Sequence, residues 1–169
     1  MLSLPTEINR FYLGYFEKSE RIFAVNLPLF TYGVLMFPEV LAALTAESFS
    51  IEPGKVYGWS RARVCHPNWD NSPILIESTG VWLEGAVISG LSEKSLLILD
   101  AFEGVPSGDF KRGVIKVECG ALRNTKALVY FPGEALLALQ AGPWDLEYFK
   151  NDLLPAYVES VVRPFLNQL

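Results

Sequence analysis

Strand-like runs crowd the middle of this 169-residue chain, and they do not alternate regularly with helical runs. The expected strands cover residues 27–32, 55–64, 73–77, 82–88, 110–118 and 124–131, and Gly58 is expected to break the second of them. The expected helices between them cover residues 38–47 and 92–102, the second capped by Ser92. A doubly wound parallel sheet needs a helix between successive strands. The pattern therefore predicts an α+β fold, which we expect to be a small mixed β-barrel with surrounding helices.

Both ends of the chain show helical patterns. Residues 6–19 have the apolar spacing of an amphipathic helix, within an N-terminal helical extension over residues 1–26. The domain proper is expected over residues 27–169 and ends in a helical tail that Pro143 opens. Because proline lacks an N–H group and crowds the preceding turn, Pro155 and Pro164 must bend or split this tail.

Charge and hydropathy exclude several classes of partner. Fourteen Lys and Arg residues against 19 Asp and Glu residues give a net charge of −5, which repels nucleic-acid phosphates. The chain has no run of basic residues for an anionic membrane surface and no uncharged apolar stretch of about 18 residues. It also lacks a signal-peptide pattern at its start. We expect a cytoplasmic protein without nucleic-acid or membrane partners, and no feature specifies an oligomeric state.

Metal and thiol chemistry have little support. A structural zinc site needs about four Cys or His ligands, and the chain offers Cys65, His66 and Cys119. Adjacent residues on a strand point to opposite faces, so Cys65 and His66 are poorly placed as a nucleophile and its base. We expect no metal and no cofactor.

The segment Phe30–Met36, FTYGVLM, is the first candidate for a binding site. Gly33 follows a strand, where it lets the backbone turn sharply and approach a ligand. The helix start that follows presents unpaired N–H groups suited to a carboxylate or phosphate. The alternative is a strand-to-helix corner with nothing bound.

The segment Leu99–Gly104, LDAFEG, is the second candidate, with Tyr130 as a third element. Glu103 stands at a helix end beside an aromatic residue, where an apolar wall would raise its pKa and suit it to proton transfer. The alternative is a solvated glutamate at a helix C-terminus. Tyr130 lies on an apolar strand, either in the core with its hydroxyl at a rim or lining a pocket.

Together these segments resemble the γ-glutamylcyclotransferase-like family, especially its plant avirulence-induced-gene branch. The matching elements occur in the family's order over about residues 28–150: Tyr32–Met36, Leu99–Gly104, Phe110–Arg112 and Val129–Tyr130. The Asp-x-Phe-Glu-Gly element is the most specific of them.

The resemblance implies a pocket between the Tyr-Gly loop and the glutamate, and intramolecular cyclisation of γ-glutamyl amides to 5-oxoproline and a free amine. No water, metal or nucleotide takes part. Glu103 is the expected general acid and base. The expected substrate-binding residues are Tyr32, Gly33, Val34, Leu35 and Tyr130, the loop acting through its N–H groups and Tyr130 through its hydroxyl.

Three departures from the family pattern bear on the substrate. Val34 replaces a Ser or Thr, and Phe110 replaces a Tyr. The loop Val105–Asp109 is longer than in the family, so we expect it to reshape the pocket mouth. Two alternatives therefore remain beside the cyclotransferase: a non-catalytic module that binds a small metabolite or a protein, and a related acyl-transfer or lyase reaction.

Overall fold

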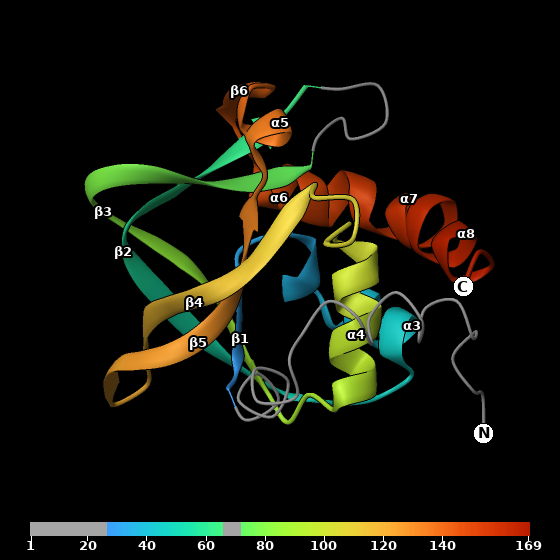
Figure 1. Ribbon diagram of the computed structural model, residues 1–169, viewed down its shortest axis with the longest axis horizontal. Helices are drawn as coiled ribbons and strands as arrows, with labels where there is room; N and C mark the ends of the chain where they lie inside the picture. The colour runs from blue at the N-terminus through green and yellow to red at the C-terminus, as the bar shows by residue number, and fades with distance from the viewer. Residues whose placement is uncertain (1–26, 66–71) are drawn as a thin grey trace.

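The computed structural model describes residues 27–65 and 72–169 (Figure 1). Its strands are β1 (Leu29–Thr31), β2 (Ser50–Val64), β3 (Pro73–Ser89), β4 (Phe110–Cys119), β5 (Leu122–Pro132) and β6 (Gln140–Pro143). Its helices are α3 (Pro38–Thr45), α4 (Glu93–Phe102), α5 (Glu134–Leu137), α6 (Leu146–Tyr148), α7 (Leu154–Tyr157) and α8 (Arg163–Leu166). The helix expected over residues 6–19, and with it the extension 1–26, lies outside the described residues.

All six strands belong to one mixed sheet, in the order β3-β1-β5-β4-β2-β6. Strand β1 runs parallel to β5, while the remaining pairs are antiparallel. Strand β2 also pairs with β3, so the series of pairings returns to its first strand. The predicted α+β class is confirmed, and the barrel stays a prediction.

Strands β2 and β3 are longer than the sequence pattern indicated. Gly58 was expected to break the first of them, and residues 73–77 and 82–88 were expected to be separate strands; both expectations were wrong. The two strands pair along most of their length, with a register shift beside Gly58. Gly58 and Gly80 both have φ of 83°. A β-bulge bends a strand without ending it, so both strands continue through these glycines.

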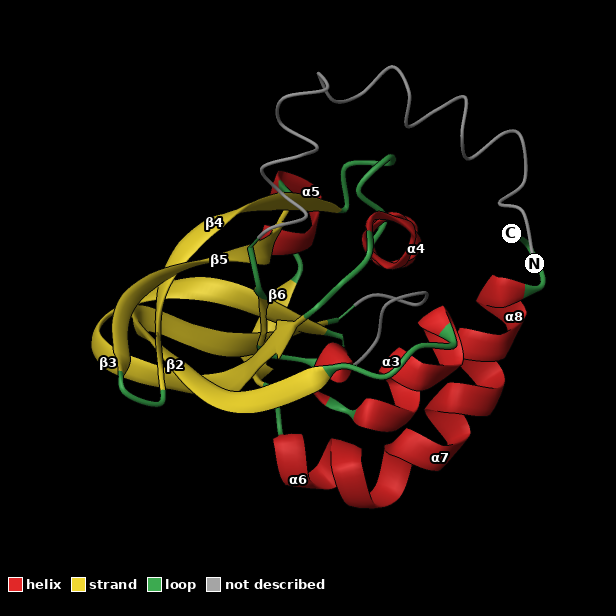
Figure 2. Cartoon of the chain, turned by 90° about the horizontal axis from the view of Figure 1, so that it is seen from below, coloured by secondary structure: helices red, strands yellow, loops and turns green. Residues whose placement is uncertain are grey.

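The apolar core has two clusters that meet at β1. Leu29 belongs to the cluster beneath the helices, together with Leu99 of α4. Phe30 and Tyr32 belong to the second cluster, among the strands. Successive side chains of a strand point to opposite faces, so β1 contributes to both. Figure 2 shows the strands gathered on one side of the molecule and α3, α7 and α8 on the other.

The C-terminal tail begins later than expected. The sequence pattern placed its start at Pro143, but Pro143 ends β6 and the first helix begins at Leu146. The side chain of Asp145 accepts a hydrogen bond of 2.9 Å from the N–H of Tyr148, which caps that helix. The short elements α5 and β6 were not expected at all.

The two tail prolines interrupt the helix as predicted. π-Helical turns over Phe149–Leu153 and Val158–Val162 stand immediately before α7 and α8. Pro155 and Pro164 lie in the first turns of those two helices. A wider turn before each proline accommodates its ring and its missing N–H group. Among the helices of the described residues, none is both long enough and apolar enough to cross a membrane.

Candidate active site

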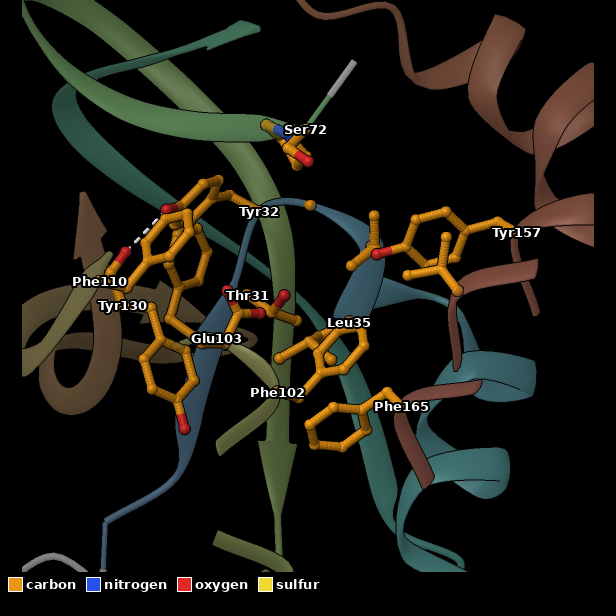
Figure 3. A pocket seen from close by; sticks show the side chains of 15 residues that line it. Thr31, Tyr32, Leu35, Ser72, Phe102, Glu103, Phe110, Tyr130, Tyr157 and Phe165 are labelled. Carbon is orange, nitrogen blue, oxygen red and sulfur yellow. Dashed lines mark hydrogen bonds between the residues drawn. The ribbon is translucent and has the colours of Figure 1, made fainter. Parts of the chain in front are cut away.

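A pocket of about 280 Å³ lies where the end of β1, the end of α4 and the C-terminal tail meet (Figure 3). The structure brings all six site residues predicted from the sequence to this pocket. Its lining is Phe30, Thr31, Tyr32, Gly33, Val34, Leu35, Ser72, Pro73, Phe102, Glu103, Phe110, Tyr130, Tyr157, Val161 and Phe165. Glu103 contributes the carboxyl group among a largely aromatic and aliphatic set.

A single 3₁₀ turn, Val34–Met36, follows β1 at the pocket. The N–H of Met36 donates to the carbonyl of Gly33 at 2.9 Å, and that of Phe37 donates to the carbonyl of Val34 at 3.3 Å. The N–H groups of Val34 and Leu35 stand at the beginning of the turn, so its own hydrogen bonds do not use them. These two groups are candidates to bind an oxygen atom of a ligand.

Gly33 is required for a different reason from the one predicted. Its φ of −135° is open to any residue, so the turn itself does not demand glycine. A Cβ atom at this position would collide with Cγ of Pro73, at the start of β3. The glycine therefore allows β3 to pack against the loop beside the pocket.

Tyr32 braces the loop rather than presenting a hydroxyl to the pocket. Its hydroxyl donates a hydrogen bond of 2.7 Å to the backbone carbonyl of Tyr130, which joins the end of β1 to β5. Its own carbonyl accepts a hydrogen bond of 2.9 Å from Nη1 of Arg61, on β2. Sequence reasoning missed Arg61, because no local pattern links it to a loop 29 residues away.

The end of α4 holds Glu103 in place. The N–H of Val105 donates to the carbonyl of Asp100 and that of Gly104 donates to Ala101, which is the hydrogen-bond pattern of a Schellman motif. Gly104 has φ of 65°, in the left-handed region that glycine adopts most easily. The Glu-Gly pair of the sequence is thus a helix stop that fixes where the carboxyl of Glu103 emerges.

The surroundings of Glu103 favour its protonated form. Burial raises the pKa of Glu103 to about 8, and the negative charge of Asp100, three residues earlier on the same helix, adds to the increase. The residue is half-buried and lines the pocket. A carboxyl group with this pKa can both take and return a proton near neutral pH.

Asp100 is the buried charge behind Glu103. Its Oδ2 atom accepts a hydrogen bond of 2.7 Å from Nη1 of Arg112, and its Oδ1 atom accepts one of 2.8 Å from the hydroxyl of Tyr130. Burial raises the pKa of Asp100 to about 6 against the opposing effects of Arg112 and Tyr130, which leaves it ionised at neutral pH. Asp100 and Arg112 both lie in segments that resemble the family in sequence, but only the fold shows that the two side chains pair.

Tyr130 lines the pocket with its ring, and its hydroxyl has the Asp100 carboxyl as a partner. The sequence-based expectation was that this hydroxyl holds the substrate. Figure 3 shows the hydroxyl at the end of the ring that points away from the middle of the pocket. The geometry therefore assigns the hydroxyl to support of Asp100 and the ring to the pocket wall.

The C-terminal tail supplies a wall that sequence reasoning missed. Tyr157, Val161 and Phe165 stand four residues apart, so they share one helical face, and that face lines the pocket. Phe165 packs edge-on against Phe102, with 5.2 Å between ring centroids. The spacing could have revealed the apolar face but not what it covers.

The longer loop after Gly104 lies apart from the pocket. None of the residues Val105–Asp109 is among the lining, so the expected effect on the pocket mouth is not found. The loop is closed on itself instead, with the hydroxyl of Ser107 donating 2.9 Å to the carbonyl of Gly104. Phe110, which follows the loop, does line the pocket.

Within residues 27–65 and 72–169, no three His, Cys, Asp or Glu side chains gather as a metal site would need. Cys65 is an exposed free cysteine, and Cys119 is a buried one. His66 lies outside the described residues.

Known proteins resemble this chain in sequence and in fold. The family model for gamma-glutamyl cyclotransferase, AIG2-like proteins matches residues 29–146. A search of curated proteins finds no significant match. An Arabidopsis thaliana protein solved in solution is 18% identical, with a TM-score of 0.56, over 84% of this chain and 92% of that chain.

Two further solved structures have the same fold. A structure named gamma-glutamyl cyclotransferase is 17% identical, with a TM-score of 0.56, over 80% of this chain and 85% of that one. An uncharacterised Homo sapiens protein is 17% identical, with a TM-score of 0.59 and the same coverage. Such identities show likeness of fold alone.

Proposed function

The chain belongs to the gamma-glutamyl cyclotransferase, AIG2-like family, and on that premise we propose that it cyclises γ-glutamyl amides to 5-oxoproline with release of an amine. The observation that carries the proposal is the position of Glu103. Its carboxyl group, with a pKa raised to about 8, lines the same pocket as the turn that begins at Val34. An acid/base group and candidate anion-binding groups thus share one cavity.

Substrate binding is assigned to the loop after β1. The N–H groups of Val34 and Leu35 bind the α-carboxylate of the γ-glutamyl group, because they are not used by the turn that they begin. The valine in place of the family's Ser or Thr removes a side-chain hydroxyl but keeps the N–H. Tyr32 and Gly33 act indirectly, since their contacts with Tyr130 and Pro73 set the position of the loop.

Proton transfer is assigned to Glu103. The ionised carboxylate takes a proton from the substrate's α-ammonium group, and the freed amine attacks the γ-carbonyl carbon of the same molecule. The five-membered ring closes, with the former carbonyl oxygen negative and the ring nitrogen carrying one proton too many. The amide C–N bond then breaks as Glu103 returns its proton to the leaving nitrogen, and the carbonyl re-forms. The ring nitrogen passes its remaining extra proton to the Glu103 carboxylate and from there to the released amine. Holding the amine near the carbonyl makes the step unimolecular.

Asp100 tunes this group without touching the substrate. Burial is the larger cause of the raised pKa of Glu103, and the negative charge of Asp100, held by Arg112 and Tyr130, raises that pKa further. Two carboxyl groups in unlike surroundings can thus have separate roles at one pH.

The partner in this proposal is a small γ-glutamyl compound, and the expected location is the cytoplasm. The expectation of no nucleic-acid partner rests on the net charge of −5, and that of no membrane partner rests on the lack of a basic run and of a long apolar stretch. No cofactor is needed, because the nucleophile belongs to the substrate.

The second candidate is a non-catalytic binding module on the same fold. It is favoured by Val34 and Phe110, which are buried and line the pocket where the family has a hydroxyl in each position. Such a pocket would hold a small metabolite without turning it over.

The test is mass-spectrometric detection of 5-oxoproline from a panel of γ-glutamyl amines and amino acids. Wild type should release it, and Glu103→Gln should reduce the rate by about 10²–10⁴-fold. Glu93→Gln is the matched control, because Glu93 is exposed at the far end of the same helix. A folded wild type that binds a panel member without product supports the binding module, and a product other than 5-oxoproline supports a related acyl-transfer or lyase reaction.

A further inference from the structure

Thr31 places a buried hydroxyl group in the wall of the pocket. It is the last residue of β1, is 5% exposed and belongs to the pocket lining. Within the described part of the chain, no hydrogen-bond partner is found for its side chain. Buried hydroxyl groups in proteins are nearly always hydrogen-bonded, and an unpaired one lowers stability. A ligand that supplies the missing partner would account for this group.

The direction of β1 puts this hydroxyl on the side of Glu103. Alternate residues of a strand share a face, so Thr31 lies on the face of Leu29, which packs in the same cluster as Leu99 of α4. Glu103 follows one turn after Leu99, at the end of that helix. Figure 3 shows the Thr31 and Glu103 side chains in the middle of the pocket.

The other hydroxyl groups of the lining differ from Thr31 in partner or exposure. The hydroxyl of Tyr32 donates to a backbone carbonyl and that of Tyr130 donates to Asp100. Ser72 and Tyr157 are partly exposed. Among the described residues, Thr31 is thus the lining residue whose side-chain hydroxyl is both buried and without a partner.

We propose that Oγ1 of Thr31 accepts a hydrogen bond from the substrate's α-amine nitrogen and holds that nitrogen beside Glu103. The inference rests on the proposed cyclisation, because that reaction requires an amine at this place. After Glu103 has taken one proton, the attacking amine still carries N–H groups, and the hydrocarbon side chains of the walls offer them no acceptor. Thr31 thereby supplies, from the preceding strand, a hydroxyl in a pocket that lacks one at Val34.

The product allows the contact to be tested without turnover. The amine nitrogen becomes the ring N–H of 5-oxoproline, which remains a hydrogen-bond donor. In 5-oxotetrahydrofuran-2-carboxylate a ring oxygen replaces this N–H while the shape and the carboxylate are kept. The difference in affinity between these two probes isolates the contact with Thr31.

The experiment is calorimetric titration of the 169-residue chain with both probes. Wild type should bind 5-oxoproline about fivefold more tightly than the ring-oxygen analogue, the range expected for one hydrogen bond. Thr31→Val, which keeps the shape, should lose this preference, and Thr31→Ser should retain it. Without ligand, the melting temperature of Thr31→Val should equal or exceed that of wild type, because an unpaired hydroxyl is removed.

Thr45→Val is the matched control for the melting temperature. Thr45 is equally buried, but its hydroxyl donates 2.7 Å to the carbonyl of Leu41, away from the pocket. Its replacement should lower the melting temperature and leave the preference between probes unchanged.

Three results would overturn the role of Thr31: a preference that survives in Thr31→Val, a ligand-free melting temperature that falls as in Thr45→Val, or no binding of either probe by wild type. The cyclisation is judged separately by release of 5-oxoproline. If wild type shows the preference but no turnover, the contact stands and the reaction fails. If wild type turns over but Thr31→Val keeps the preference, only the contact fails.

Discussion

Nη1 of Arg112 lies 2.7 Å from Oδ2 of Asp100, with the two side chains 7% and 0% exposed. The pair joins β4 to the last turn of α4, directly behind Glu103. It therefore links the stability of the fold to the charge that acts on the proposed catalytic carboxyl.

Removing Asp100 should destabilise the protein strongly. Asp100→Ala leaves the buried Arg112 without this carboxylate and takes the acceptor from the Tyr130 hydroxyl. We expect a loss of about 3–5 kcal/mol in the free energy of unfolding, measured by urea denaturation. Arg123→Ala is the control, because Arg123 pairs with Glu118 on the surface with 76% of its side chain exposed, and it should cost less than about 1 kcal/mol. Similar losses for both variants would contradict the importance of burial.

The stability of the protein should depend on pH through Glu103. Its pKa is about 8 in the folded state and about 4.5 for an unperturbed glutamate, so the folded state binds more protons between these values. Stability from this group is fully present below about pH 4.5 and is lost as the pH rises through 8. Glu103→Gln cannot ionise. Its melting temperature should match wild type near pH 4 and exceed it increasingly up to pH 8, by about 2–4 °C per kcal/mol. A constant difference across this range would show that the carboxyl is not perturbed.

The pH dependence of turnover should report the same group. Glu103 must be ionised to act as a general base. We therefore expect kcat/KM to rise with pH and to level off above an apparent pKa of about 8. In Asp100→Asn the neighbouring negative charge is absent, so the apparent pKa of the profile should fall. The measurement is a kcat/KM profile at a temperature where the variant remains folded. An apparent pKa that is the same in the variant as in wild type would exclude Asp100 as a source of the raised pKa of Glu103.

A side chain at position 33 should disturb the loop through Pro73. In Gly33→Ala the new Cβ collides with the proline ring, and we expect a loss of about 1–3 kcal/mol together with weaker ligand binding. The matched test is Gly33→Ala with Pro73→Ala, which removes the obstructing ring. Thermal unfolding of both variants checks this, and a double variant no more stable than the single one would refute the steric account.

The tail wall should select among leaving amines. Val161 lines the pocket from the C-terminal tail and is 40% exposed, so Val161→Trp narrows the pocket from its rim. We expect kcat/KM to fall about tenfold for bulky amines and less for small ones. Val114→Trp is the control, since Val114 is 52% exposed on β4 and is not part of the lining. An equal loss for all amines would place the leaving group elsewhere.

Some of the site could be predicted because its signals are local. The glycine after Glu103 predicts a helix stop, and the structure has that stop as a Schellman motif with Gly104 in the left-handed region. The cap of α4 at Ser92 was also predicted from a local signal. In the structure the Ser92 side chain accepts a hydrogen bond from the N–H of Ser95. The order of the family elements then predicted that Tyr32, Glu103 and Tyr130 would meet.

Other parts escaped prediction because residues distant in sequence decide them. Gly33 was explained by backbone freedom, whereas the actual constraint is the side chain of Pro73, on another strand. The hydroxyl of Tyr130 was expected to bind the substrate, but in the fold it donates a hydrogen bond to Asp100 on α4. Gly58 was expected to break a strand, yet Tyr57 and Trp59 on either side of it both pair with β3, so the strand continues.

The sequence by itself determined the fold class, the family and six residues of the candidate site, because periodicity, helix caps and ordered motifs are written in neighbouring positions. Only the tertiary structure decided the electrostatics of that site and its outer wall. The burial of Asp100 against Arg112, the unpartnered hydroxyl of Thr31 and the tail face of Tyr157, Val161 and Phe165 all depend on which elements pack together. Desolvation and side-chain pairing act through space, so a chain reveals them once it is folded.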